Sequence, residues 1–137
     1  MTTLSALDEL IQAASAVEPA VARRAGISTS ELQALRHLID GSRGPVELSH
    51  LLGVTSAASS GVVDRLAASG HVVRRPHPDD GRRTQVEVTA SGRQEVDALL
   101  RPLQAQLAEV DAGLGDDERA VVGRYLEAVT RALRSLL

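Results

Sequence analysis

Residues 70–92 read GHVVRRPHPDDGRRTQVEVTASG, and this stretch decides the fold of the chain. Two short runs with β-branched residues, HVVRR and TQVEVT, flank a polar segment that carries two prolines, two aspartates and a glycine. Proline, aspartate and glycine favour a chain reversal, and β-branched residues favour paired strands. The stretch therefore predicts a β-hairpin with arginines on or beside it: Arg74, Arg75, Arg82 and Arg83.

Two short helical patterns separated by a turn precede the hairpin. Pro45 opens the first pattern, which runs to Leu52, because proline suits the first turn of a helix. Gly53 interrupts the pattern, and Thr55 can cap the second helix, residues 56–68. The positions of this second helix that are predicted to face inward are Ser59, Val62, Val63 and Leu66. The arrangement predicts a helix-turn-helix whose second helix can enter the major groove of DNA.

The outward side of this second helix carries small, uncharged residues. They are Ser56, Ala57, Ser60 and Gly61, with Arg65 near them. Serine and alanine can contact phosphates or thymine methyls, but they lack the two-pronged hydrogen bonds that arginine or glutamine makes with a base. A glycine also costs about 1 kcal/mol in a helix interior. We therefore expect either a very close backbone approach to DNA or specificity that rests on shape and wing contacts.

An amphipathic helix is predicted at the N-terminus, and a second one follows it. The first carries apolar residues at three- and four-residue steps: Leu4, Leu7, Ile11, Ala14 and Val17. It should end near Gly26, and Ser28 or Thr29 can cap the next helix, which has Glu31 in its first turn.

The C-terminal part of the chain predicts two more helices. Thr89 begins the first, Pro102 implies a bend in it, and Asp116 or Asp117 can cap the second. Together with the N-terminal helix, they carry more apolar surface than a small helix-turn-helix unit needs. The surplus fits either a larger monomeric core or a dimer interface. Because a winged helix is compact by itself, we favour the dimer.

The charges are distributed unevenly along the chain. The net charge is −3, but residues 65–93 hold six arginines against three acidic residues. A local basic patch can attract phosphate, because distant charges are screened beyond about 10 Å. There is no cysteine, no apolar run near the roughly 18 residues that span a bilayer, and no signal-peptide pattern. We therefore expect a cytoplasmic protein that makes no contact with a membrane.

Three stretches together carry a family resemblance: ISTSELQALRHLI, PVELSHLLGVTSAASSGVVDRLAASG and HVVRRPHPDDGRRTQVEVTASG. Their most specific part is VVDRLAASGHVVRRPHPDDGRR, with Asp-Arg-Leu, a glycine, an arginine and an Asp-x-Arg turn in order. This pattern resembles the MarR family of bacterial transcription regulators over nearly the whole chain. The resemblance implies one mainly α domain, residues 1–137, with a small antiparallel β-wing. Within it, residues 28–90 would form the winged helix-turn-helix lobe, and residues 1–26 and 91–137 the dimerisation helices.

The resemblance also assigns roles to residues. Asp80 and Arg82 match the wing's Asp-x-Arg, in which the arginine reaches a minor groove and the aspartate orients its guanidinium. Asp64 and Arg74 match positions that pair between the recognition helix and the wing. The predicted DNA-binding residues are Thr55, Ser56, Ala57, Ser60, Gly61, Arg65, Arg74, Arg75, His77, Arg82 and Arg83. The alternative interpretation of the wing turn is a solvated loop with local salt bridges.

The resemblance implies a homodimeric repressor that binds double-stranded DNA at a palindrome and is released by a small anionic or phenolic effector. The alternative is a dimeric winged-helix scaffold with weak or no DNA binding. Arg36 or His37 could hold the effector, although both suit exposed helix positions. The four histidines lack metal-ligand spacing, and no cysteine nucleophile, phosphate-binding glycine loop or Gly-x-Ser-x-Gly elbow is present. We therefore predict no metal, no cofactor and no catalysis.

Overall fold

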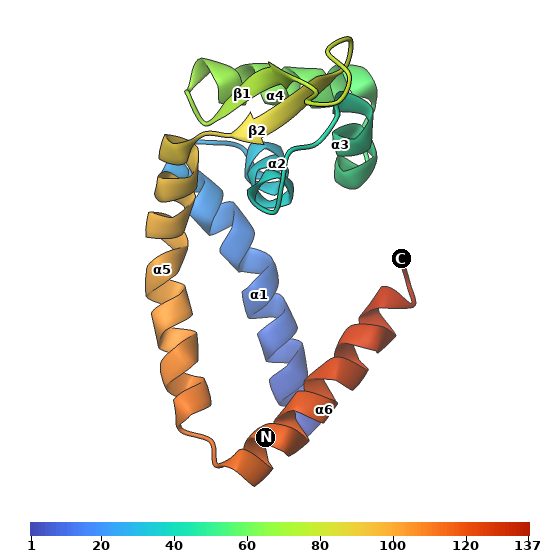
Figure 1. The fold of residues 1–137 in the computed structure, drawn as a ribbon. Coiled ribbons are helices and arrows are strands. Elements are labelled where there is room, and N and C mark those ends of the chain that lie inside the picture. Colours follow the sequence, from blue (N-terminus) through green and yellow to red (C-terminus); the bar gives the residue numbers. More distant parts are fainter. The chain divides into compact units, whose positions relative to one another are not determined.

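The computed structural model describes residues 1–137 and contains six helices and one two-stranded antiparallel sheet (Figure 1). The helices are α1 (Thr3–Ala25), α2 (Thr29–Ile39), α3 (Pro45–Leu52), α4 (Ser56–Ala68), α5 (Ala90–Ala112) and α6 (Asp116–Arg134), and the strands are β1 (Val72–Pro76) and β2 (Thr84–Val88). This mainly helical architecture with a small antiparallel hairpin confirms the predicted fold class. None of the helices combines the length and the apolar character that a membrane span requires.

The contacts divide the chain into two compact units, Met1–Leu100 and Arg101–Leu137. The first unit contains α1 to α4, the hairpin and the beginning of α5, and the second contains the rest of α5 and α6. The division falls inside α5 next to Pro102, and the helix continues through this proline. Because α1 packs against α2, the N-terminal helix belongs to the first unit.

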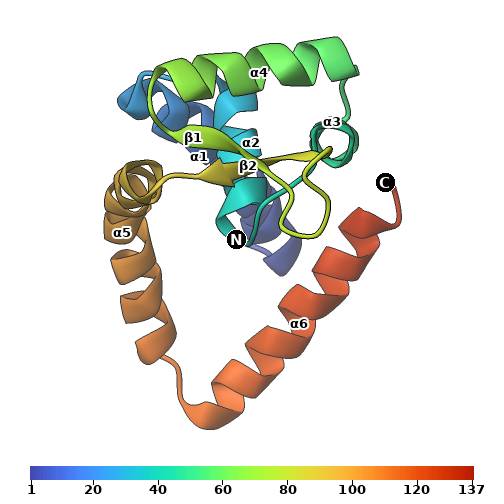
Figure 2. The ribbon, with the colours of Figure 1, turned by 45° about the horizontal axis from the view of Figure 1, so that its top comes forward.

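The core of the first unit lies between α2, α3, α4 and the hairpin. Its most completely buried large side chains are Leu35, Leu38, Leu48, Leu66 and Val86. The hairpin contacts both α2 and α4, and Figure 2 shows it beside α4. The four positions of α4 that were predicted to face inward are all buried, which confirms the orientation of this helix.

Local sequence signals set most helix boundaries. Gly26 and Gly53 end α1 and α3 in the left-handed region, with φ angles of 70° and 66°. The hydroxyl of Ser28 accepts the backbone N–H of Glu31 at the start of α2, and Thr55 caps α4 in the same way. These ends agree with the sequence predictions.

The predicted cap of α6 is wrong by one position. Gly115, rather than Asp116 or Asp117, occupies the N-cap, and the helix begins at Asp116. Glu118 reaches back and accepts the backbone N–H of Gly115 at 2.9 Å. The two aspartates therefore lie in the first turn, where negative side chains interact favourably with the helix dipole.

The start of α5 is fixed against the segment that joins α4 to β1. Thr89 donates its backbone N–H to the carbonyl of His71 at 2.9 Å and its hydroxyl to the carbonyl of Gly70 at 2.7 Å. Gly92 lies directly on the His71 backbone, since a Cβ at position 92 would be 2.3 Å from the His71 carbonyl oxygen. Only a residue without a side chain fits this contact.

We predict that Gly92→Ala lowers the free energy of unfolding by roughly 3 kcal/mol, because the added methyl group forces α5 away from β1. Urea denaturation followed by circular dichroism measures the change. Gly61→Ala is the matched control in α4, because its Cβ would meet only the flexible end of Arg65 at 3.5 Å. The control should be neutral or stabilise the protein by up to about 1 kcal/mol. Equal effects of the two changes would contradict the close contact.

Candidate nucleic-acid interface

The second helix of the helix-turn-helix, α4, has a solvent-facing side of small residues. Ser56, Ala57 and Ser60 are exposed, and Gly61 is half-buried. Thr55 is exposed at the N-cap, and its hydroxyl accepts the backbone N–H of Ala58 at 3.1 Å. The structure thus leaves this side of α4 open, with little side-chain bulk between its backbone and an approaching molecule.

The hairpin forms a wing beside α4. Val72 pairs with Val88 at its base and Pro76 pairs with Thr84 at its end. The turn beyond these pairs is closed by backbone hydrogen bonds, from His77 N–H to the Arg83 carbonyl at 2.8 Å and from Arg83 N–H to the Asp80 carbonyl at 3.0 Å. The predicted turn therefore has an ordered backbone, and it presents side chains from a defined loop.

An ion pair joins α4 to the wing. Arg74 on β1 donates from Nη2 to Oδ1 of Asp64 on α4 at 2.6 Å. This is the contact that the resemblance implied for these two positions. A second pair lies within the hairpin, where Arg75 Nε and Glu87 Oε2 are 3.0 Å apart. Both arginines are therefore partly committed to holding the wing in place.

Asp80 makes a different contact from the predicted one. Its carboxylate accepts the backbone N–H of Arg82 at 3.1 Å, and it forms no ion pair with the Arg82 guanidinium. An aspartate commonly bonds the amide two residues later, because its short side chain then closes a local turn. In the structure Asp80 therefore shapes the backbone of the turn, and Arg82 is exposed without an ion pair; the role of Asp80 in orienting the guanidinium on DNA stays a prediction.

The arginines of the lobe differ in whether they have acidic partners. Arg65 pairs with Glu31 at 3.1 Å, and Arg74 and Arg75 pair as described above. Arg82 and Arg83 are exposed and form no salt bridge. The wing turn therefore carries two arginines without ion-pair partners, next to the exposed carboxylates of Asp79 and Asp80, and His77 is half-buried there.

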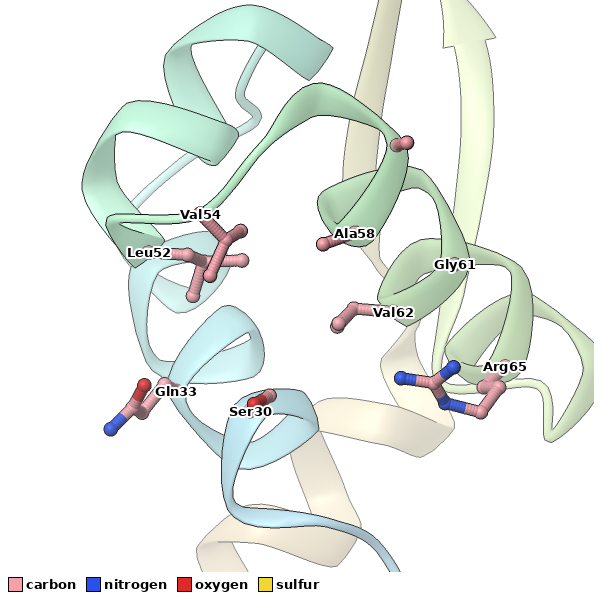
Figure 3. A pocket seen from close by; sticks show the side chains of 9 residues that line it. Ser30, Gln33, Leu52, Val54, Ala58, Gly61, Val62 and Arg65 are labelled. Carbon is pink, nitrogen blue, oxygen red and sulfur yellow. The ribbon is translucent and has the colours of Figure 1, made fainter.

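A hollow of about 380 Å³ lies between α2, the turn after α3, and α4 (Figure 3). Ser30 and Gln33 line it from α2, and Gly61 and Arg65 line it from α4. The hollow follows from the small residues of α4, because a larger side chain at Gly61 would fill part of it.

Sequence reasoning missed the role of Glu31. The residue was assigned only to the first turn of α2, yet its carboxylate accepts Nε of Arg65, which lies 34 positions later. Glu31 is buried, and its Oε1 also accepts the hydroxyl of Ser28 at 3.1 Å. No local spacing could reveal this contact, because it depends on how α2 packs against α4.

The remaining titratable residues do not come together in a metal-binding cluster. No group of three or more His, Asp or Glu side chains is placed to hold a metal ion. His71 is buried, and its ring nitrogens contact Glu95 at 2.7 Å and Ser69 at 2.5 Å. Arg36 is exposed and lies 3.7 Å from Glu18.

Comparison with known proteins identifies relatives of this chain. The model of the MarR family matches residues 25–83. An HTH-type transcriptional regulator of Mycobacterium bovis is 38% identical over 97 residues, which are 70% of this chain and 68% of that protein. The HTH-type transcriptional repressor YetL of Bacillus subtilis is 30% identical over 104 residues, 74% of this chain. The match spans 62% of the repressor's own length.

Solved structures share the fold over nearly the whole chain. RV1404 from Mycobacterium tuberculosis has a TM-score of 0.75 and 25% identity, with 96% of this chain and 94% of that chain covered. The apo form of MarR from E. coli has a TM-score of 0.65 and 24% identity, with 94% and 97% covered. The fold, the matched family model and the mycobacterial relative together establish that the chain belongs to the MarR family of winged helix-turn-helix transcription regulators.

Proposed function

We propose that this protein is a transcriptional repressor that binds a palindromic DNA operator as a homodimer and leaves it when a small anionic or phenolic effector binds. The observation that carries the proposal is the pair of exposed, unpaired arginines at the wing turn, Arg82 and Arg83, beside the open side of α4. The name of one relative supports repression, since YetL is described as a repressor.

The wing is suited to a minor groove. A guanidinium fits the narrow, negative minor groove of A·T-rich DNA and can donate several hydrogen bonds at once. Arg82 is free to make such contacts, because Asp80 bonds its backbone and leaves its side chain unpaired. The Asp64–Arg74 ion pair, 2.6 Å long, then holds the wing at a fixed angle to α4.

The open side of α4 suits the major groove. Helix N-termini and small hydroxyl residues bind phosphates, and close backbone approach is easiest where side chains are small. Thr55, Ser56 and Ser60 supply hydroxyl groups at the exposed N-terminal half of α4. In this arrangement the wing supplies two arginine side chains without ion-pair partners, and α4 supplies a surface that follows the groove.

A homodimer would cover apolar side chains that the single chain leaves in solvent. α6 has no buried residue. Most of the large apolar residues with at least about a third of their surface exposed lie on the first helix and the last two: Leu4, Leu10, Ile11 and Val17 on α1, Leu107 and Val110 on α5, and Val121, Val122, Tyr125, Leu126 and Leu133 on α6. Exposed apolar surface of this extent is typical of an interface. Two-fold symmetry would present two lobes to half-sites about one helical turn apart.

Effector release requires a ligand that binds the free protein better than the DNA-bound protein. A thermal-shift screen of anionic and phenolic compounds, followed by operator binding with each hit, tests this part of the proposal. A compound that raises the melting temperature and weakens operator binding supports it.

Selection from a random duplex pool tests DNA binding directly. We expect the purified protein to enrich a palindromic sequence and to bind it with an affinity that falls as salt rises. If no sequence is enriched and the affinity does not depend on salt, the chain is instead a winged-helix scaffold or protein-interaction module.

We predict that Arg82→Ala weakens operator binding by about 10-fold or more, because an unpaired guanidinium at the wing loses its contacts with the minor groove. The slope of log affinity against log salt should decrease by about 1. Fluorescence anisotropy over a salt series measures both quantities, and thermal melting should stay unchanged. Arg101→Ala removes the same charge from an exposed position outside the lobe and serves as control. Unchanged binding by Arg82→Ala would show that the wing is assigned wrongly.

We predict that Leu126→Asp on α6 produces a monomer, because a buried charge at the dimer interface is strongly unfavourable. Operator affinity should then fall by about 100-fold or more, since two linked half-sites bind far more tightly than one. Sedimentation velocity gives the oligomeric state. Leu51→Asp on α3 is the matched control, because Leu51 is 43% exposed and Leu126 is 44% exposed. A dimeric Leu126→Asp variant would place the interface elsewhere.

A further inference from the structure

The guanidinium of Arg65 lies in the space that Gly61 leaves open on α4. The two residues are one helical turn apart, and a Cβ at position 61 would be 3.5 Å from Nη1 of Arg65. Figure 3 shows the Arg65 side chain at the rim of the hollow beside Gly61. A longer side chain at position 61 would compete for this space, so the glycine and the position of the arginine are linked.

Glu31 holds one edge of this guanidinium. Nε of Arg65 donates to Oε1 of Glu31 at 3.1 Å, while the side chains of Arg65 and Glu31 are 59% and 10% exposed. Ser28 fixes the carboxylate from the other side, through its hydroxyl at 3.1 Å. Nη1 and Nη2 of Arg65 have no partner in the protein. The arginine is therefore anchored at Nε and has two free donor nitrogens, Nη1 and Nη2, at its end.

We propose that Arg65 is the base-reading residue of α4 and that Glu31 is its positioning residue. The inference rests on the proposed function, because it assumes that α4 enters a major groove. One N–H from each of the two terminal nitrogens of an arginine matches O6 and N7 of guanine, which is the commonest specific contact in the major groove. Each half-site should therefore contain a G·C pair that Arg65 selects.

The net charge of the Arg65–Glu31 pair distinguishes base reading by Arg65 from contact with a phosphate. A paired arginine and glutamate have no net charge, so they contribute little to the release of counterions that drives phosphate binding. Moving Arg65 away would leave the buried Glu31 carboxylate without its partner, which is strongly unfavourable. The pair therefore attracts DNA phosphates only weakly. The fixed orientation of the Arg65 guanidinium suits a directional hydrogen bond to a base. The unpaired Arg82 and Arg83 have the opposite character.

The test compares base preference and salt dependence for the parent protein and Arg65→Ala. We expect Arg65→Ala to lose about 10-fold of the discrimination at one G·C pair in each half-site. The double variant Arg65→Ala/Glu31→Gln removes both charges of the pair, so its salt slope should change much less than that of Arg82→Ala. A uniform loss over all sequences, with a slope smaller by about 1, would instead identify Arg65 as a phosphate contact and overturn the inference.

Two further variants test the arrangement while keeping the arginine. Glu31→Gln keeps an oxygen acceptor but leaves Arg65 with net positive charge, so binding to random DNA should tighten and its salt slope should steepen. Gly61→Leu should displace the guanidinium and lose the same base preference as Arg65→Ala, while leucine favours the helix. If Glu31→Gln leaves random-DNA binding unchanged, or Gly61→Leu keeps the G·C preference, the positioning role is refuted.

The same selections separate this inference from the proposed function. A parent protein that enriches no sequence would overturn both. A parent that enriches a palindrome, together with an Arg65→Ala variant of identical base preference, would overturn only the role of Arg65.

Discussion

The lobe depends on one junction, where His71 connects α4, β1 and α5. The His71 N–H bonds the Leu66 carbonyl at 2.9 Å, and its own carbonyl accepts the N–H of Thr89 at 2.9 Å. Gly92 lies on the same backbone, where a Cβ would be only 2.3 Å from the carbonyl oxygen. Because the wing begins at the next residue, any movement of α5 here would change the angle between α4 and the wing. DNA binding by two elements requires that this angle be fixed.

Ion pairs between elements hold several arginines of the lobe in place, in a chain whose net charge is −3. Glu31, Asp64 and Glu87 each pair with an arginine of the lobe at 3.1 Å or less. These pairs fix geometry, and they also remove charge from α4 and the strands. At the wing turn the guanidinium groups of Arg82 and Arg83 stay free of ion pairs, next to the exposed Asp79 and Asp80.

Features that depend on neighbouring residues could be predicted from the sequence, and those that depend on packing could not. Proline at a first turn, a threonine cap and the periodicity of the buried positions located α3 and α4, because each acts within one helical turn. The cap of α6 was missed because Gly115 offers no side chain to read, and Glu118 supplies the bond instead. The Glu31–Arg65 contact was missed because it joins residues on two helices.

Gly61 shows how these two kinds of information combine. In the sequence it is only a helix interior glycine, which costs about 1 kcal/mol relative to alanine. In the structure it makes room for a guanidinium that Glu31 anchors from α2. The small surface of α4 then does not imply a helix without specificity, because the reading group is supplied from one turn away. Under this arrangement the wing arginines contribute mainly to the affinity for DNA, and Arg65 on α4 contributes mainly to the selection of a base. Affinity and specificity can therefore change independently.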